Sequence, residues 1–68
     1  MVLYWKKDNK YYKLFEQSTS FGTIDVVCVW GRIGGNLGGC KIISCDTDQD
    51  VELAVNSIKK RRQYRGYQ

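Results

Sequence analysis

The stretch Thr23–Trp30 reads TIDVVCVW and decides the fold. It is rich in β-branched side chains, which favour extended backbone. Its side chains alternate with a period of two, so that Ile24, Val26, Cys28 and Trp30 share one face. We therefore predict a strand over 23–30 with one apolar face.

Three further strands are predicted outward from this stretch. Residues 2–6 and 10–16 are rich in aromatic and β-branched side chains, and the turn-forming residues 7–9 separate them, which is typical of an antiparallel hairpin. A polar loop follows at 18–22. Residues 31–39 contain five glycines and Asn36 and predict a connection, whereas residues 40–45 predict the fourth strand.

The period then changes to that of a helix. Val51, Ala54, Val55 and Ile58 form one apolar stripe. Thr47 is suited to the N-cap with Asp50 as the acid of a capping box, and Gly66 is suited to the position after the C-cap. We expect a helix from about Asp48 to about Tyr64. The fold class is thus α+β, with a small antiparallel sheet of about four strands packed against one C-terminal helix.

Length and composition restrict the function. A chain of 68 residues has room for one domain, which we expect to span residues 1–68. The chain has no histidine, the commonest general base and metal ligand, so we do not expect an enzyme. It has no apolar run of membrane-spanning length and no signal-peptide pattern at its start. We expect a cytoplasmic or nucleoid-associated protein without a membrane partner.

The three cysteines indicate reduced thiols. Their number is odd, and the eleven and four residues between them do not match the close pairs of a cysteine metal site. We expect at least two of Cys28, Cys40 and Cys45 to be small buried hydrophobic residues, and we expect no metal and no cofactor. A cysteine-thiolate enzyme is the weakest alternative, because Lys41 beside Cys40 is its only support.

Positive charge is concentrated at the C-terminal end. The net charge is +4, and residues 59–65 carry five positive charges and no negative one. Such a cluster favours polyanionic partners, although cations at a helix C-terminus also stabilise the helix dipole.

Trp30-Gly31-Arg32 carries the clearest functional signal. The indole offers a flat face for stacking on a base or sugar, Gly31 allows a close backbone approach, and the guanidinium of Arg32 fits phosphate. The alternative is a core tryptophan, because Trp30 shares its face with apolar side chains.

At these residues the chain resembles the WGR domain, which is named for this tripeptide. Three blocks in order carry the resemblance: the aromatic strand at 10–14, the signature at 30–34, and a basic helix end followed by Arg65-Gly66-Tyr67. The resemblance covers nearly the whole chain. It implies an antiparallel sheet with a helix against it, and it implies DNA binding near strand breaks, as in poly(ADP-ribose) polymerases. WGR domains also occur in bacterial proteins. By resemblance, Trp30 would pack on a terminal nucleotide's sugar, and Arg32 would contact phosphate or another domain.

We therefore predict a non-catalytic nucleic-acid-binding module. DNA, including strand ends or breaks, is the expected partner, and RNA is the alternative nucleic acid. The predicted binding residues are Trp30, Gly31, Arg32, Lys41, Lys59, Lys60, Arg61, Arg62 and Arg65. The alternative function is a protein–protein interaction or assembly module that acts with a separate partner chain, such as a catalytic domain on another chain. We expect a monomer or a weak homodimer.

Overall fold

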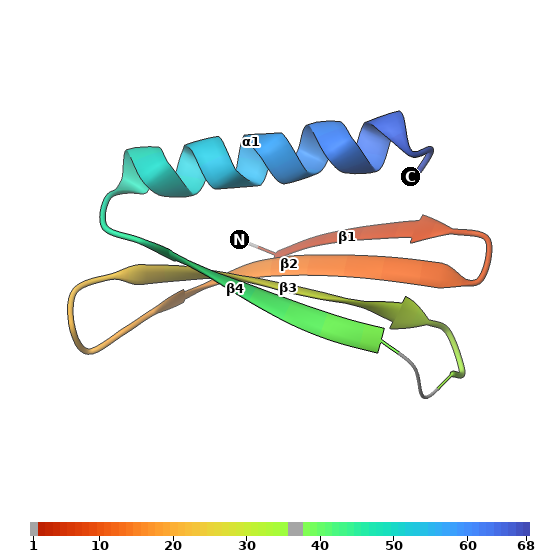
Figure 1. Cartoon of the computed structure of the whole chain (residues 1–68), viewed down its shortest axis with the longest axis horizontal. Coiled ribbons are helices and arrows are strands. Elements are labelled where there is room, and N and C mark those ends of the chain that lie inside the picture. Colours follow the sequence, from red (N-terminus) through yellow and green to blue (C-terminus); the bar gives the residue numbers. More distant parts are fainter. Residues whose placement is uncertain (1, 36–37) are drawn as a thin grey trace.

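The computed structural model describes residues 2–35 and 38–68, which form a four-stranded sheet and one helix (Figure 1). The strands are β1 (Val2–Lys7), β2 (Lys10–Ser18), β3 (Ile24–Arg32) and β4 (Gly38–Cys45), and the helix α1 spans Asp48–Tyr64. Each strand pairs antiparallel with the next, in the order β1-β2-β3-β4. The predicted α+β class, the hairpin and the helix bounds are confirmed.

The two strands that flank the glycine-rich segment are longer than predicted. β3 continues through Gly31 and Arg32, and β4 begins at Gly38, because Trp30 pairs with Gly39 and Gly31 pairs with Gly38. The prediction that 31–39 is wholly a connection was therefore wrong at both ends. Its central residues, Asn36 and Leu37, lie outside the described residues. The signature tripeptide consequently lies within a strand, where the ladder fixes its backbone.

Both ends of α1 are capped as the sequence predicts. The backbone N–H of Asp50 donates to the Thr47 hydroxyl at 3.1 Å. At the other end Gly66 adopts a φ of 86°, and the N–H of Tyr67 donates to the Arg62 carbonyl at 2.9 Å. With the N–H of Gly66 donating to the carbonyl of Gln63 at 3.1 Å, this is a Schellman motif. It turns Tyr67 back toward the sheet.

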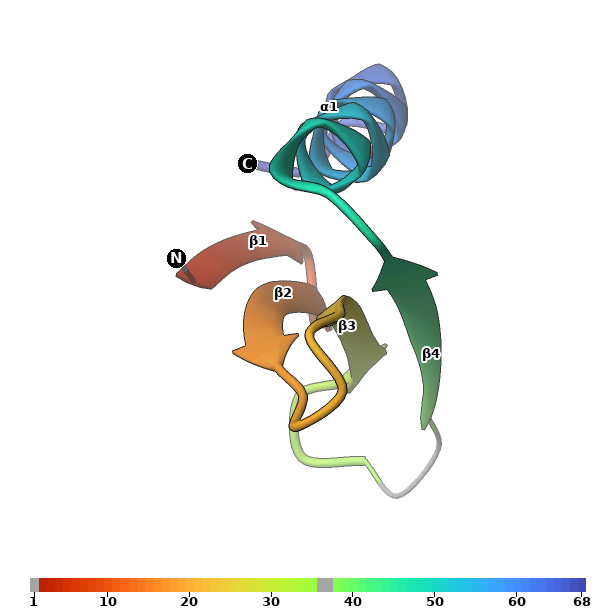
Figure 2. The same cartoon turned by 90° about the vertical axis from the view of Figure 1, so that its left-hand side faces the viewer.

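The core lies between the sheet and α1, which covers one face of the sheet (Figure 2). Leu14, Val26 and Cys28 are fully buried there, and Val51 and Val55 pack on them from the helix. Cys45 is also buried and Cys40 is exposed, so the prediction of at least two buried cysteines is confirmed. The helix of the described chain lacks the length and apolar run that crossing a membrane requires.

Candidate nucleic-acid interface

Trp30 is positioned by its two neighbours across the sheet. On β2 it pairs with Tyr12, and the two rings stack with centroids 5.8 Å apart and planes 9° apart. On β4 it pairs with Gly39, where an added Cβ would lie 2.7 Å from the indole. Glycine is therefore needed at position 39 for the indole to lie against β4. The Trp30 residue is 37% exposed, so it is neither sealed in the core nor fully free.

Tyr12 is the centre of a cluster of aromatic rings. Trp5 packs edge-on at 6.1 Å, and Tyr67 packs edge-on at 6.5 Å from the C-terminal turn. Burial, with Cys28 as the second cause, raises the pKa of Tyr12 to about 12. The phenol is thus neutral, and its ring is packed against the indole.

Arg62 is a buried cation between two rings. Its guanidinium carbon lies 4.1 Å from the centre of the Tyr12 ring and 5.1 Å from that of Tyr67, and the residue is only 7% exposed. Within residues 2–35 and 38–68 its buried Nε has no hydrogen-bond partner. The electron-rich ring faces stabilise the charge, but they leave its hydrogen-bonding capacity unused. Such a cation favours an anion from outside the chain.

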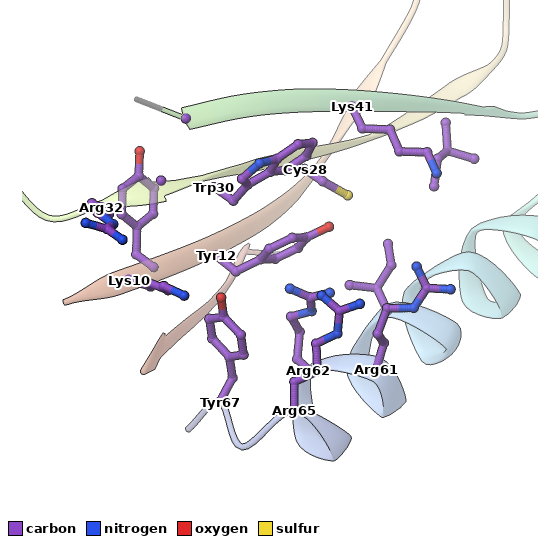
Figure 3. A pocket seen from close by; sticks show the side chains of 15 residues that line it. Lys10, Tyr12, Cys28, Trp30, Arg32, Lys41, Arg61, Arg62, Arg65 and Tyr67 are labelled. Atoms are coloured by element: carbon purple, nitrogen blue, oxygen red, sulfur yellow. The ribbon is translucent and has the colours of Figure 1, made fainter. Parts of the chain in front are cut away.

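These side chains line a pocket of about 640 Å³ between the sheet and the C-terminal part of α1 (Figure 3). Its walls contain the aromatic residues Tyr11, Tyr12, Trp30 and Tyr67. They also contain six cations, namely Lys10, Arg32, Lys41, Arg61, Arg62 and Arg65. None of the described lining residues is acidic. The potential in the pocket is therefore positive, and the concave shape concentrates that field.

The family model of the WGR domain matches residues 4–68, essentially the whole chain. The chain belongs to the WGR family. No curated protein and no solved structure matches it. WGR domains are nucleic-acid-binding modules, and the tripeptide that names them is here part of the wall of a cationic pocket.

Most of the predicted binding residues of this WGR domain come together in the pocket. The lining includes Trp30, Gly31, Arg32, Lys41, Arg61, Arg62 and Arg65. Lys59 and Lys60 are exposed on α1 but are absent from the lining. Helical spacing explains this separation, because Ile58, Arg61 and Arg62 lie on the side of α1 that faces the sheet, and 59 and 60 project from the other side.

Sequence reasoning did not include several other residues that line the WGR pocket, among them Lys10, Tyr12 and Tyr67. The signal for Tyr12 was its period-two relation to Leu14, which places both on the face toward the helix. Tyr67 reaches the pocket only because the turn at Gly66 reverses the chain. Lys10 begins β2 opposite Arg32, a pairing that only the register reveals.

The described lining of this WGR pocket offers cations and aromatic rings, which are groups that bind anions and flat rings. Within the described residues, no three His, Cys, Asp or Glu side chains come together in a way that could hold a metal ion. Burial, followed by the nearby carboxylates of Asp50, Asp25 and Asp46, raises the pKa of the Cys45 thiol. A raised pKa keeps that sulfur protonated and makes it a poor nucleophile.

Proposed function

We propose that this WGR domain is a non-catalytic module that binds DNA. The cations of the pocket hold phosphates, and the exposed part of the Trp30 ring packs on a sugar or base. The observation that carries the proposal is the arrangement of six cations, without an acidic lining residue among those described, around a partly exposed indole.

The placement of the cations supports phosphate binding. They come from four separate segments: β2 gives Lys10, β3 gives Arg32, β4 gives Lys41, and the end of α1 gives three arginines. Arginine binds phosphate through two parallel N–H groups, and a positively charged site attracts anions most strongly when no carboxylate is near. Each phosphate contact carries no base information, so we expect weak sequence preference.

The pocket's size supports a terminal or unpaired nucleotide as the part that enters it. A volume of about 640 Å³ is within the roughly 300–1,000 Å³ range of small-ligand sites, and it is too small for a duplex. Tyr12 already covers part of the Trp30 ring, so a sugar or base would extend this stack. Stacking of this kind contributes about 1–3 kcal/mol per base. We therefore propose strand ends or breaks as targets. A DNA-binding role would place the protein in the cytoplasm or nucleoid.

The test is a fluorescence titration with blunt, nicked and single-stranded oligonucleotides at two salt concentrations. A Trp5→Phe variant leaves Trp30 as the only tryptophan. We expect its emission to change on binding, and log K to fall with log salt at a slope of about −0.9 per phosphate neutralised on duplex DNA. A nicked duplex, which has a break in addition to its two ends, should bind more tightly than a blunt duplex of the same length.

The matched control compares two double variants that each remove two positive charges, one inside the pocket lining and one outside it. Lys41→Gln/Arg61→Gln removes two charges from the pocket, and Lys59→Gln/Lys60→Gln removes two charges outside it. We expect the first pair to weaken binding and flatten the salt slope more than the second. Equal effects would refute the pocket as the binding site. An affinity insensitive to salt would favour the protein-interaction alternative.

A further inference from the structure

The face of the sheet that points away from α1 is here called the outer face. No other described element covers it (Figures 1 and 2). The register aligns an apolar row across all four strands: Val2, Phe15, Val27 and Ile42. The two ends of this row are largely open to solvent, since Val2 is 64% and Ile42 is 59% exposed.

Apolar and aromatic side chains continue on one side of this row. The next row contains Tyr4, Val29 and Cys40, with Lys13 among them. The Tyr4 ring stacks on Tyr11 at 6.3 Å with planes 4° apart. Val27 in the middle of the row is only 9% exposed, so the solvent-exposed apolar area lies mainly at Val2, Tyr4 and Ile42. Exposed apolar side chains grouped on one face of a sheet indicate an interaction surface.

The outer face also carries opposite charges on opposite sides of the apolar row. Lys13 precedes Phe15 by two residues on β2, and its amine lies 5.7 Å from the centre of that ring. On the other side of the row lie Gln17 of β2 and its cross-strand partner Asp25 of β3. The Ser44 hydroxyl donates to the Asp25 carboxylate at 3.1 Å, which leaves this acid without a cationic partner in that contact.

We propose that the outer face binds a second copy of this chain. A twofold axis along the apolar row brings the two outer faces together and exchanges the rows on its two sides. Lys13 of one copy then lies opposite the partner's Gln17 and beside the partner's Asp25. Symmetry makes two such ion pairs, one on each side of a shared apolar centre. The face is thus complementary to itself in charge.

The area of the outer face suits a weak dimer. Four strands about 4.8 Å apart and the three rows that face each other, about 7 Å apart, cover roughly 400 Å² on each copy. Two copies together would bury roughly 800 Å², an area typical of weak, transient contacts. We expect a reversible dimer with a dissociation constant on the order of micromolar, formed in the absence of nucleic acid.

Sedimentation equilibrium of the whole chain over a wide concentration range tests this proposal. We expect a monomer–dimer equilibrium that Ile42→Asp abolishes, because it places a carboxylate in the apolar row. Leu53→Asp is the matched control, since Leu53 is similarly exposed (63%) but lies on α1. A chain that stays monomeric up to millimolar concentration would overturn the proposal, as would equal behaviour of the two variants.

Charge reversal gives a second test that does not depend on the apolar row. Lys13→Glu should raise the dissociation constant by about tenfold or more, because it sets two carboxylates close together across the interface. The double variant Lys13→Glu/Asp25→Lys should restore dimerisation, since each reversed charge again meets its opposite. If the double variant dimerises no better than the single one, the proposed axis is wrong. Circular dichroism of each variant checks that it is folded.

Discussion

At the scale of single residues, Arg62 is the most unusual feature of the domain. A buried guanidinium loses several kcal/mol of hydration, whereas a desolvated cation–π contact returns about 2 kcal/mol. The rings of Tyr12 and Tyr67 therefore offset only part of the cost of burying this charge. The burial of a residue that is costly to the free protein is explained if its charge stabilises an anion bound in the pocket.

Replacing Arg62 with methionine separates these two roles. Methionine keeps most of the packing volume and makes favourable contacts with aromatic rings, but it carries no charge. We expect Arg62→Met to leave the free energy of unfolding unchanged or to raise it, and to weaken DNA binding by about 1.5–3 kcal/mol. Urea unfolding and the oligonucleotide titration measure the two effects.

The control for this substitution is Lys60→Met, outside the pocket lining. It removes one charge from the same helix, so it reports the loss of general electrostatic attraction. If Arg62→Met instead destabilises the fold by several kcal/mol and binds DNA as well as Lys60→Met does, then Arg62 has a purely structural role.

The raised pKa of Tyr12 predicts that the folded state loses stability at high pH. Burial raises its pKa from the ordinary 10.0 to about 12, so the folded state holds the phenolic proton more tightly than the unfolded state does. Its contribution to stability is therefore complete below about pH 10 and is lost as the pH rises from 10 to 12. Urea unfolding across this range should show a steeper decline for the natural chain than for Tyr12→Phe, which has no proton to lose.

Comparing the natural chain with the Tyr12→Phe variant cancels the loss of stability caused by other groups that lose protons at high pH. Cys45 also has a raised pKa and weakens both proteins alike as the pH increases. Parallel pH profiles for the natural chain and the Tyr12→Phe variant would contradict the burial of a neutral phenol.

The sequence predicts the role of a residue well when that role depends only on its neighbours in the chain. Thr47 and Gly66 were assigned from helix-end chemistry alone, because capping involves only neighbours in the chain. Arg62 was predicted as a binding residue from the charge cluster, but its burial was not expected. The helical stripe that contains Val55 and Ile58 does extend to position 62, so the periodicity carried that signal.

At the scale of elements, the strands with alternating side chains were predictable from the sequence, but the glycine-rich ends of β3 and β4 were not. The bounds of β3 and β4 were underestimated because glycine normally indicates a loop. Gly38 and Gly39 are extended here since they pair with Gly31 and Trp30, and a Cβ at either position would contact the backbone or indole of Trp30. The pairing comes from the tertiary structure, which local sequence patterns do not contain.

The turn after α1 is the element on which the pocket most depends. Gly66→Ala would place a side chain at a φ of 86°, which costs about 1 kcal/mol of stability. It would also disturb the position of Tyr67 beside Arg62 and Tyr12, so we expect weaker DNA binding in addition. Thermal unfolding and the oligonucleotide titration measure these effects.

Gly22→Ala is the matched control for this turn. Gly22 has a φ of 83° with no atom within 4 Å of an added Cβ, and it lies in the β2–β3 turn, whose residues do not line the pocket. It should cost a similar amount of stability without affecting binding. If both variants bind DNA equally well, the C-terminal turn does not shape the binding site.

At the scale of the whole molecule, the topology joins features that are far apart in the sequence. A meander sheet places Tyr12 beside Trp30, and the helix returns its basic end over both, which separate motifs could not predict. The same topology separates two surfaces. α1 covers one side of the sheet (Figure 2). Most of the pocket lining comes from that side and from α1, whereas Tyr11, Gly31 and Gly38 belong to a row of the outer face.

This separation predicts that a dimer bridges two DNA molecules. Two copies joined through their outer faces would present their pockets in opposite directions, so that each pocket could hold its own strand. Beads carrying one oligonucleotide should therefore capture a second, fluorescent oligonucleotide when the protein is added. Capture should fall again when protein is in large excess, because each DNA then binds its own dimer.

Variants of the two surfaces distinguish failure of the dimer from failure of DNA binding. Ile42→Asp should bind each oligonucleotide separately but should not bridge them, whereas Leu53→Asp should do both. Lys41→Gln/Arg61→Gln should still dimerise but should bind and bridge poorly, since those cations line the pocket. Bridging by Ile42→Asp at the natural level would mean that one copy alone contacts two DNA molecules. Binding without bridging by a natural chain that sedimentation shows to be dimeric would mean that its pockets do not face opposite ways.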